Sequence, residues 1–138
     1  MATHDIGSKR WNDPARDDDG TRILIARFRP RGVAKANETW VEWHRELSPS
    51  EGLHAAYYGK LGVEITWDQY RTKFLEEMRG QEMHIEALAR RVLRGEKLTL
   101  LCSNACTDPS RCHRTLVIEL VHDLIARSTD VTGLTQRR

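Results

Sequence analysis

The stretch LTLLCSNACTDPSRCHRTLVIELVHDLIAR at residues 98–127 decides the fold. The apolar run at 98–101 is typical of a strand covered on both faces. Asp108 and Pro109 then favour a helix start, because the Asp side chain can cap free N–H groups and Pro needs no N–H at the first helical position. A helix from there to about Arg127 carries one broad apolar face at roughly 100° per residue, which predicts that it packs on a sheet.

A second buried strand is predicted at residues 21–28, because Ile23, Leu24 and Ile25 make both of its faces apolar. A weaker strand signal surrounds Ile6. Apolar residues at helical spacing predict helices between the two buried strands, and these begin near residues 37, 51, 67 and 81.

Helices between two strands imply a crossover connection and parallel pairing of the strands. We therefore predict an α/β fold in a single domain over residues 1–127, with a small, mainly parallel sheet covered by helices. Residues 128–138 are predicted to form a frayed C-terminal tail.

Composition limits the classes of function. A chain of 138 residues suits one ordinary core, and a formal net charge of +2 is too small for a general nucleic-acid binder, so any electropositive site must be local. No apolar segment is long enough to span a membrane, and residues 1–20 lack the apolar core of a signal peptide. We therefore expect a cytoplasmic protein with no membrane partner, whose three cysteines stay thiols or bind something. No cofactor and no oligomeric state are predicted.

Three arginines, Arg27, Arg29 and Arg31, alternate along the chain at the end of the first buried strand. If the backbone stays extended, their guanidinium groups project to one side. Ligands usually bind beyond the carboxyl ends of parallel strands, so these arginines are expected to share a crevice with the loop that follows the second strand. The alternative is a solvated surface, or ion pairs with the acidic run at 17–19.

Several motifs resemble those of a known family. They are Cys102, Asp108-Pro109 and Cys112-His113-Arg114 after the LTLL strand, Asp19-Gly20, Arg22-Ile23-Leu24-Ile25, Arg27 and Pro30-Arg31-Gly32 in the N-terminal half, and Ser48-Pro49-Ser50 with Trp67, Tyr70 and Phe74 between them. Together they resemble the bacterial and archaeal family catalogued as domain of unknown function 488, for which no function is established. The chain departs from that pattern at Ala26, where the family usually has Asp, and at Arg29, where it usually has Trp.

The start of the last helix is the expected chemical centre. Arg111, His113 and Arg114 crowd the positive end of its dipole, where a bound anion would relieve the repulsion. His113 is expected to look inward and either to donate to an anion or to move a proton near neutral pH, and the alternative is a core histidine. Cys112 is the nucleophile candidate, because a helix N-terminus beside Arg and His lowers a thiol pKa.

These observations lead to one functional prediction. A phosphate-bearing ligand, either a nucleotide or a nucleic-acid segment, binds in a basic crevice formed by Arg27, Arg29, Arg31 and Arg114, with His113 and Cys112 as the catalytic candidates. Whether the protein is an enzyme or a binding module stays open.

The competing hypothesis is a metal-binding or redox-sensing module built on Cys102, Cys106, Cys112 and His113. The spacing is unusual for zinc, and a helix from Pro109 would turn Cys112 partly away, although a helix that begins at Ser110 would weaken that objection. We therefore rank this module second, and expect less than about a tenth of an equivalent of zinc or iron after purification without chelator.

Overall fold

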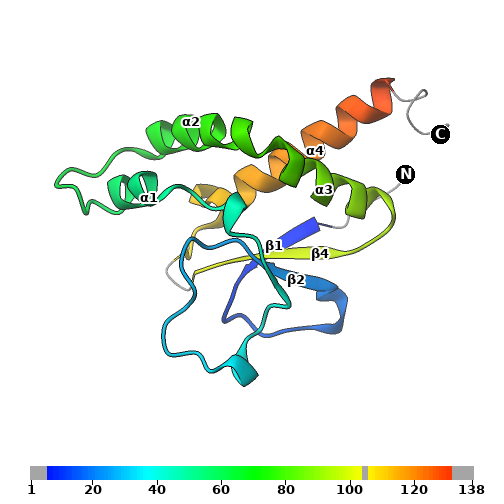
Figure 1. Ribbon diagram of the computed structural model, residues 1–138, viewed down its shortest axis with the longest axis horizontal. Helices are drawn as coiled ribbons and strands as arrows, with labels where there is room; N and C mark the ends of the chain where they lie inside the picture. Colours follow the sequence, from blue (N-terminus) through cyan, green and yellow to red (C-terminus); the bar gives the residue numbers. More distant parts are fainter. Residues whose placement is uncertain (1–5, 104–105, 132–138) are drawn as a thin grey trace.

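Parallel pairing joins the four strands of the sheet in the spatial order β1-β4-β2-β3. In chain order the strands are β1 (Ile6–Arg10), β2 (Thr21–Leu24), β3 (Glu42–Trp43) and β4 (Leu98–Cys102). The computed structural model describes residues 6–103 and 106–131. The α-helices in this part are α1 (Glu51–Tyr57), α2 (Trp67–Met78), α3 (Glu82–Leu93) and α4 (His113–Val131). Figure 1 shows the helices together on one side of the strands, so the predicted α/β fold with a small parallel sheet is confirmed.

The two buried strands are neighbours, as predicted. β2 pairs with β4 from Thr21 opposite Leu98 to Leu24 opposite Leu101. The regular strand ends at Leu24, four residues before the predicted boundary, although the Ile25 N–H still donates to the Leu101 carbonyl at 2.9 Å. Beyond this point the chain leaves the sheet.

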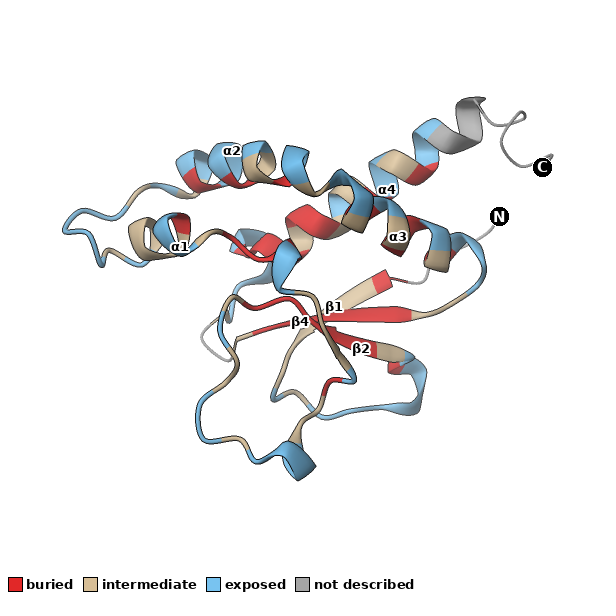
Figure 2. Cartoon of the chain, viewed as in Figure 1, coloured by how far each residue is buried: buried red, intermediate tan, exposed pale blue. Residues whose placement is uncertain are grey.

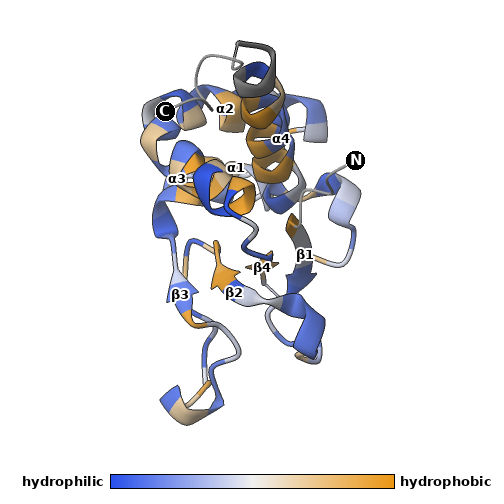
Figure 3. Cartoon of the chain, turned by 90° about the vertical axis from the view of Figure 1, so that its right-hand side faces the viewer, coloured by the Kyte–Doolittle hydropathy of each residue, from blue (hydrophilic) through white to orange (hydrophobic). Residues whose placement is uncertain are grey.

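The larger core lies between the helices and one face of the sheet. Ile23 and Leu100 reach it from the two central strands, and Val117 reaches it from α4. Figure 3 shows the hydrophobic residues gathered on α4 and β2, with all four helices on the same side of the strands. Other fully buried residues of the larger core include Ile25, Leu47, Phe74, Leu88, Leu98 and Val121.

Irregular chain, rather than helices, covers the opposite face. Leu24 and Leu101 point to this side and pack with Trp40, which meets the edge of Trp11 at a centroid distance of 6.2 Å. In Figure 2 the connections before β2 and after it lie below the sheet, with buried segments where they approach it. The apolar sequences of both central strands therefore match burial on two faces.

The helix predicted to begin near residue 37 does not form. The segment instead contains 3₁₀ turns at Lys35–Asn37 and Arg45–Leu47, with β3 between them. Backbone groups of this segment form hydrogen bonds with the edge of β2, for example from the His44 N–H to the Leu24 carbonyl at 2.8 Å. Tertiary pairing has replaced the local helix that the spacing predicts.

The predicted helix ends are largely confirmed. Thr66 and Gln69 form the capping box at the start of α2, with hydrogen bonds of 2.8 and 3.1 Å between each side chain and the other's N–H. Ser50 caps α1 by accepting from the Leu53 N–H. Gly95 follows α3 with a φ of 94°, the left-handed conformation that favours glycine after a helix.

α4 begins later than predicted. Asp108 caps a separate 3₁₀ turn, Pro109–Arg111, by accepting from the Ser110 N–H at 3.0 Å, and the α-helix starts only at His113. Cys112 between them has an extended backbone, with φ −139° and ψ 144°. This break frees Cys112 from the geometry of a helical turn.

At its other end α4 continues past residue 127 to Val131. The rest of the predicted frayed tail, residues 132–138, lies outside the described part of the chain. Among the helices of residues 6–103 and 106–131, none combines the length and the apolar character needed to cross a membrane.

Candidate metal centre

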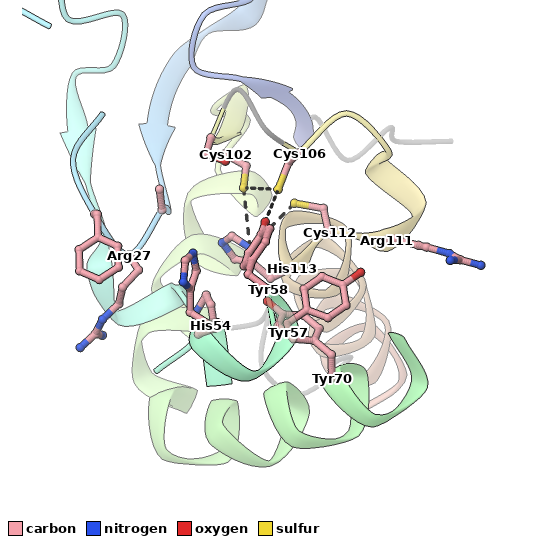
Figure 4. Close-up of a pocket in the computed structure, with 14 residues that line it drawn as sticks. Arg27, His54, Tyr57, Tyr58, Tyr70, Cys102, Cys106, Arg111, Cys112 and His113 are labelled. Atoms are coloured by element: carbon pink, nitrogen blue, oxygen red, sulfur yellow. Dashed lines mark hydrogen bonds between the residues drawn. The ribbon is translucent and has the colours of Figure 1, made fainter. Parts of the chain in front are cut away.

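Four ligand-type side chains meet where β4 ends and α4 begins (Figure 4). Cys102 is the last residue of β4, His113 is the first residue of α4, Cys112 directly precedes it, and Cys106 lies on the loop between. The sulfurs of the three cysteines lie within 4.8 Å of one another. Nδ1 of His113 lies 3.9 Å from the Cys102 Sγ and 3.9 Å from the Cys112 Sγ. The structure therefore brings together the three cysteines of the competing hypothesis and places His113 beside two of them.

One hydrogen bond fixes the tautomer of His113. Its Nε2 lies 2.7 Å from the Ile25 carbonyl oxygen, and because a carbonyl can only accept, Nε2 carries the proton. Nδ1 then presents its lone pair toward the sulfurs. Burial is the main cause that lowers the pKa of His113, which keeps the ring neutral near pH 7. Metal-binding histidines are held in this way, with the second ring nitrogen bound to a carbonyl or carboxylate.

The donor spacing is close to that of a tetrahedral zinc site. Zn–S bonds of about 2.3 Å and a Zn–N bond of about 2.0 Å place two sulfurs roughly 3.8 Å apart, and a sulfur and a nitrogen roughly 3.6 Å apart. The two sulfur–nitrogen distances of 3.9 Å are near that value, and the Cys102 and Cys106 sulfurs are closer, at 3.1 Å. His113 is not within 4.8 Å of all three sulfurs, so the Cys106 loop would have to move toward His113 for all four side chains to bind one ion.

The three thiols differ in acidity. Hydrogen bonds from the Cys102 and Cys112 thiols lower the pKa of Cys106, whereas the bond to Cys106 raises the pKa of Cys102. At Cys112 the bond with Cys102 lowers the pKa, but the bond with Cys106 and burial outweigh it and raise the value to about 12. The predicted lowering at Cys112 is therefore wrong, because its thiol acts as a donor inside the cluster. Within the cluster, Cys106 is the thiol whose pKa is lowered.

The cluster forms the floor of a small cavity, with a volume of about 90 Å³, whose walls are largely aromatic. The Tyr58 hydroxyl lies 3.7 Å from the Cys106 Sγ. Burial raises the pKa of Tyr58, so its hydroxyl keeps the proton and can donate to that sulfur. At the rim, the His54 ring contacts Phe28 and Tyr58 at centroid distances of 5.6 and 4.7 Å.

The predicted arginine crevice does not assemble. Arg27 lines the cavity, but Arg29 is paired with Glu38 at 2.7 Å and lies over the Trp40 ring, and Arg31 is exposed outside the cavity lining. The three side chains diverge because the extended strand ends at residue 24 and the alternation does not continue. Arg114 is buried, and its Nη2 donates to the Cys106 carbonyl at 3.1 Å.

Residues 6–124 match the family model "DUF488-N3a: Active DUF488-N3 subclade". The chain belongs to the DUF488 family. It is similar to an uncharacterised protein named YeaO from Escherichia coli (strain K12), with 36% identity over 98 residues, which are 71% of this chain and 82% of that protein. No solved structure gives a significant match.

The DUF488 match includes all four residues of the cluster and both positions where the chain departs from the usual family pattern. Ala26 lies in the cavity wall, where its carbonyl accepts a 2.8 Å hydrogen bond from the Trp43 indole N–H. Arg29 lies outside the cavity lining. Neither departure changes a residue of the Cys/His cluster.

Sequence reasoning missed three contributors to this DUF488 site. Ile25 contributes through its carbonyl, which no residue pattern reveals. His54 and Tyr58 arrive with α1, far from the cluster in sequence. In the sequence, the feature that indicates these two side chains is that His54 and Tyr58 lie one helical turn apart, shortly after the Ser48-Pro49-Ser50 motif.

Proposed function

We propose that Cys102, Cys106, Cys112 and His113 bind one transition-metal ion. The observation that carries this proposal is a group of three sulfurs within 4.8 Å of one another, two of which lie 3.9 Å from the Nδ1 of a histidine whose Nε2 is held by the Ile25 carbonyl. The sequence ranked this module second because a helix from Pro109 would turn Cys112 away. The later start of α4 removes that objection, so we now expect an occupied site.

Zinc fits the donor set best. Three thiolates and a neutral imidazole in a tetrahedral arrangement suit zinc, with iron as the nearest competitor. Because the protein supplies all four ligands, the ion would be structural: it would tie the end of β4 to the start of α4 and stabilise the fold. His113 then acts as a ligand and not as a proton carrier, and Cys112 as a ligand and not as a nucleophile.

Cobalt(II) provides a direct test, because tetrahedral thiolate coordination gives it intense sulfur-to-metal charge-transfer absorption. Titration of the reduced, metal-free protein should saturate at about one equivalent, the stoichiometry of a single four-ligand site. His113→Gln should weaken cobalt binding by at least about tenfold, since even partners that only orient a ligand contribute that much. His54→Gln is the matched control, because it alters a cavity histidine outside the cluster, and it should bind cobalt like the wild type.

A reductant must be present during the titration, since the Cys102 and Cys106 sulfurs lie only 3.1 Å apart and can oxidise to a disulfide. Weak absorption typical of six-coordinate cobalt in the reduced wild type would count against the centre.

A phosphate-bearing ligand remains the second candidate, with fewer arginines than the sequence predicted. Arg27 and Arg111 line the cavity, and neither forms an ion pair with any residue that the structure describes. Figure 4 shows their guanidinium groups directed outward from opposite sides of the cavity, where they could reach different parts of one ligand. The exposed rings of Phe28 and Tyr58 are suited to stacking on a nucleobase.

Titration with adenosine monophosphate at low salt tests this candidate. Arg27→Gln should weaken binding about tenfold, which corresponds to about 1.4 kcal/mol. Arg29→Gln should change the affinity by less than about twofold, which matches the small contribution of an arginine engaged elsewhere. A short single-stranded oligonucleotide should show steep salt dependence if nucleic acid is the ligand. No measurable affinity for either probe would remove the candidate.

A further inference from the structure

Arg114 is buried with too few partners. The residue is only 3% exposed, and among the described residues only one of its three guanidinium nitrogens, Nη2, has a partner, the Cys106 carbonyl at 3.1 Å. Nε and Nη1 have no hydrogen-bond partner within the described residues. Arginine does not lose its proton in proteins. A full positive charge therefore lies beside the cysteine cluster with two unsatisfied nitrogens.

The carboxylate that interacts with Arg114 is shared with another arginine. Asp13 interacts electrostatically with Arg114, but it is paired with Arg10 at 3.1 Å and its side chain is 32% exposed. A poorly compensated buried charge destabilises a fold, and Asp13, which also pairs with Arg10, compensates Arg114 only in part, so a closer negative group would stabilise the guanidinium.

The cluster is well placed to supply it. The side chain of Arg114 donates to the carbonyl of Cys106 at 3.1 Å, and the backbone N–H of Arg114 is one of the groups that lower the pKa of the Cys112 thiol. A zinc ion with three thiolates and a neutral histidine has a net charge of about −1, the sum of +2 and three negative sulfurs. Together with the positive charge of the Arg114 guanidinium, the net charge is zero.

We propose that Arg114 is the buried counter-charge of a metal-loaded trithiolate centre, and that it positions Cys106 through the carbonyl. This inference rests on the proposed metal function. It assigns Arg114 a positioning role in place of the anion-ligand role that the sequence predicted. The charge at position 114 then tunes metal affinity only while the centre holds three thiolates.

Zinc affinities measured by competition with a chromophoric chelator test the proposal. Arg114→Gln should weaken zinc binding by at least about tenfold, and Arg114→Lys, which keeps the charge, by less than about threefold. Arg90→Gln is the matched control, since it removes an exposed arginine on α3 that lies outside the cavity lining, and it should change the affinity by less than about twofold.

A second background separates charge from structure. Cys106→His converts the centre to two thiolates and two histidines, whose zinc complex is neutral. In this background Arg114→Gln should leave zinc affinity unchanged or increase it, and it should raise the thermal stability of the loaded protein. This comparison stays informative if Arg114→Gln alone does not fold, because the double variant is then expected to fold better than Cys106→His.

Four outcomes would overturn the proposal. An equal loss of zinc affinity in both backgrounds would assign Arg114 a purely structural role. If phosphate or sulfate stabilises the metal-free wild type but not Arg114→Gln, the counter-charge is an anion in the neighbouring groove lined by Ser8, Lys9, Arg10 and Thr107. If the wild type binds no zinc at all, the metal function itself fails; normal zinc binding by Arg114→Gln would remove only the role of Arg114.

Discussion

Cys112→Ser is expected to reduce bound zinc from about one equivalent to less than about a tenth, since a site that loses one of its thiolates loses most of its affinity at neutral pH. The unfolding temperature should fall with it. A ligand present at about a thousand times its dissociation constant stabilises a protein by about 4 kcal/mol, and for a chain of 138 residues this corresponds to roughly 10–20 °C. Differential scanning calorimetry and elemental analysis of the same sample measure both effects.

A chelator distinguishes loss of metal from loss of packing. It should lower the unfolding temperature of the wild type toward that of Cys112→Ser and leave the variant unchanged. Ser103→Ala is the control, because it alters a cavity residue next to Cys102 without removing a sulfur. A Cys112→Ser protein that retains metal, or that unfolds at the wild-type temperature, would contradict the expectation.

Asp19→Asn is expected to lower the free energy of unfolding by about 3–5 kcal/mol, the range for removing one member of a buried ion pair. The Asp19 carboxylate binds the Arg22 guanidinium at 2.6 Å and the Lys9 ammonium at 2.7 Å, and accepts from the Arg16 N–H at 3.1 Å. Its loss would leave the buried Arg22 with backbone acceptors only. Urea denaturation measures the change, and Asp18→Asn, at the exposed neighbouring position, should change stability by less than about 0.5 kcal/mol.

The same carboxylate predicts a pH dependence. Burial raises the pKa of Asp19, but hydrogen bonds from Lys9, Arg16 and Arg22 together outweigh it and lower the value from 3.8 to about 2. Because the pKa is lower in the folded state, this stabilisation is complete above pH 4 and is lost as the pH falls toward 2. The difference in stability between wild type and Asp19→Asn should therefore shrink over that interval. A difference that stays constant from pH 6 to pH 2 would show that the ion pairs do not carry the effect.

The sequence was most informative about segments that are buried on both sides. The apolar runs of β2 and β4 left no alternative to a central parallel pair, and that pairing was predicted correctly. The prediction from sequence was wrong at residues 37–47, where Trp40, Trp43 and Leu47 have helical spacing but no α-helix forms. Trp40 packs beneath the sheet, Trp43 belongs to β3, and Leu47 enters the main core. A one-dimensional period cannot distinguish residues that share one helical face from residues that serve three separate contacts.

The candidate site was predicted in composition but not in arrangement. Cys102, Cys112 and His113 were all named, yet their ranking depended on a helix that starts at Pro109. The actual start at His113 places Cys112 in extended backbone and buries it in the cluster. Arg29 was assigned to the site by alternation, but pairs with Glu38 because the strand ends early. The predicted start of α4 and the predicted end of β2 were each wrong by a few residues, and the predicted directions of Cys112 and Arg29 were therefore wrong as well.

Metal analysis of the wild-type protein tests the central claim most directly. The protein should be produced with zinc available and purified with a reductant and without chelator. Elemental analysis should then give close to one zinc per chain, and X-ray absorption should show three sulfurs at about 2.3 Å and one nitrogen at about 2.0–2.1 Å. Less than about a tenth of an equivalent of any transition metal, in protein whose three thiols titrate as reduced, would contradict the account.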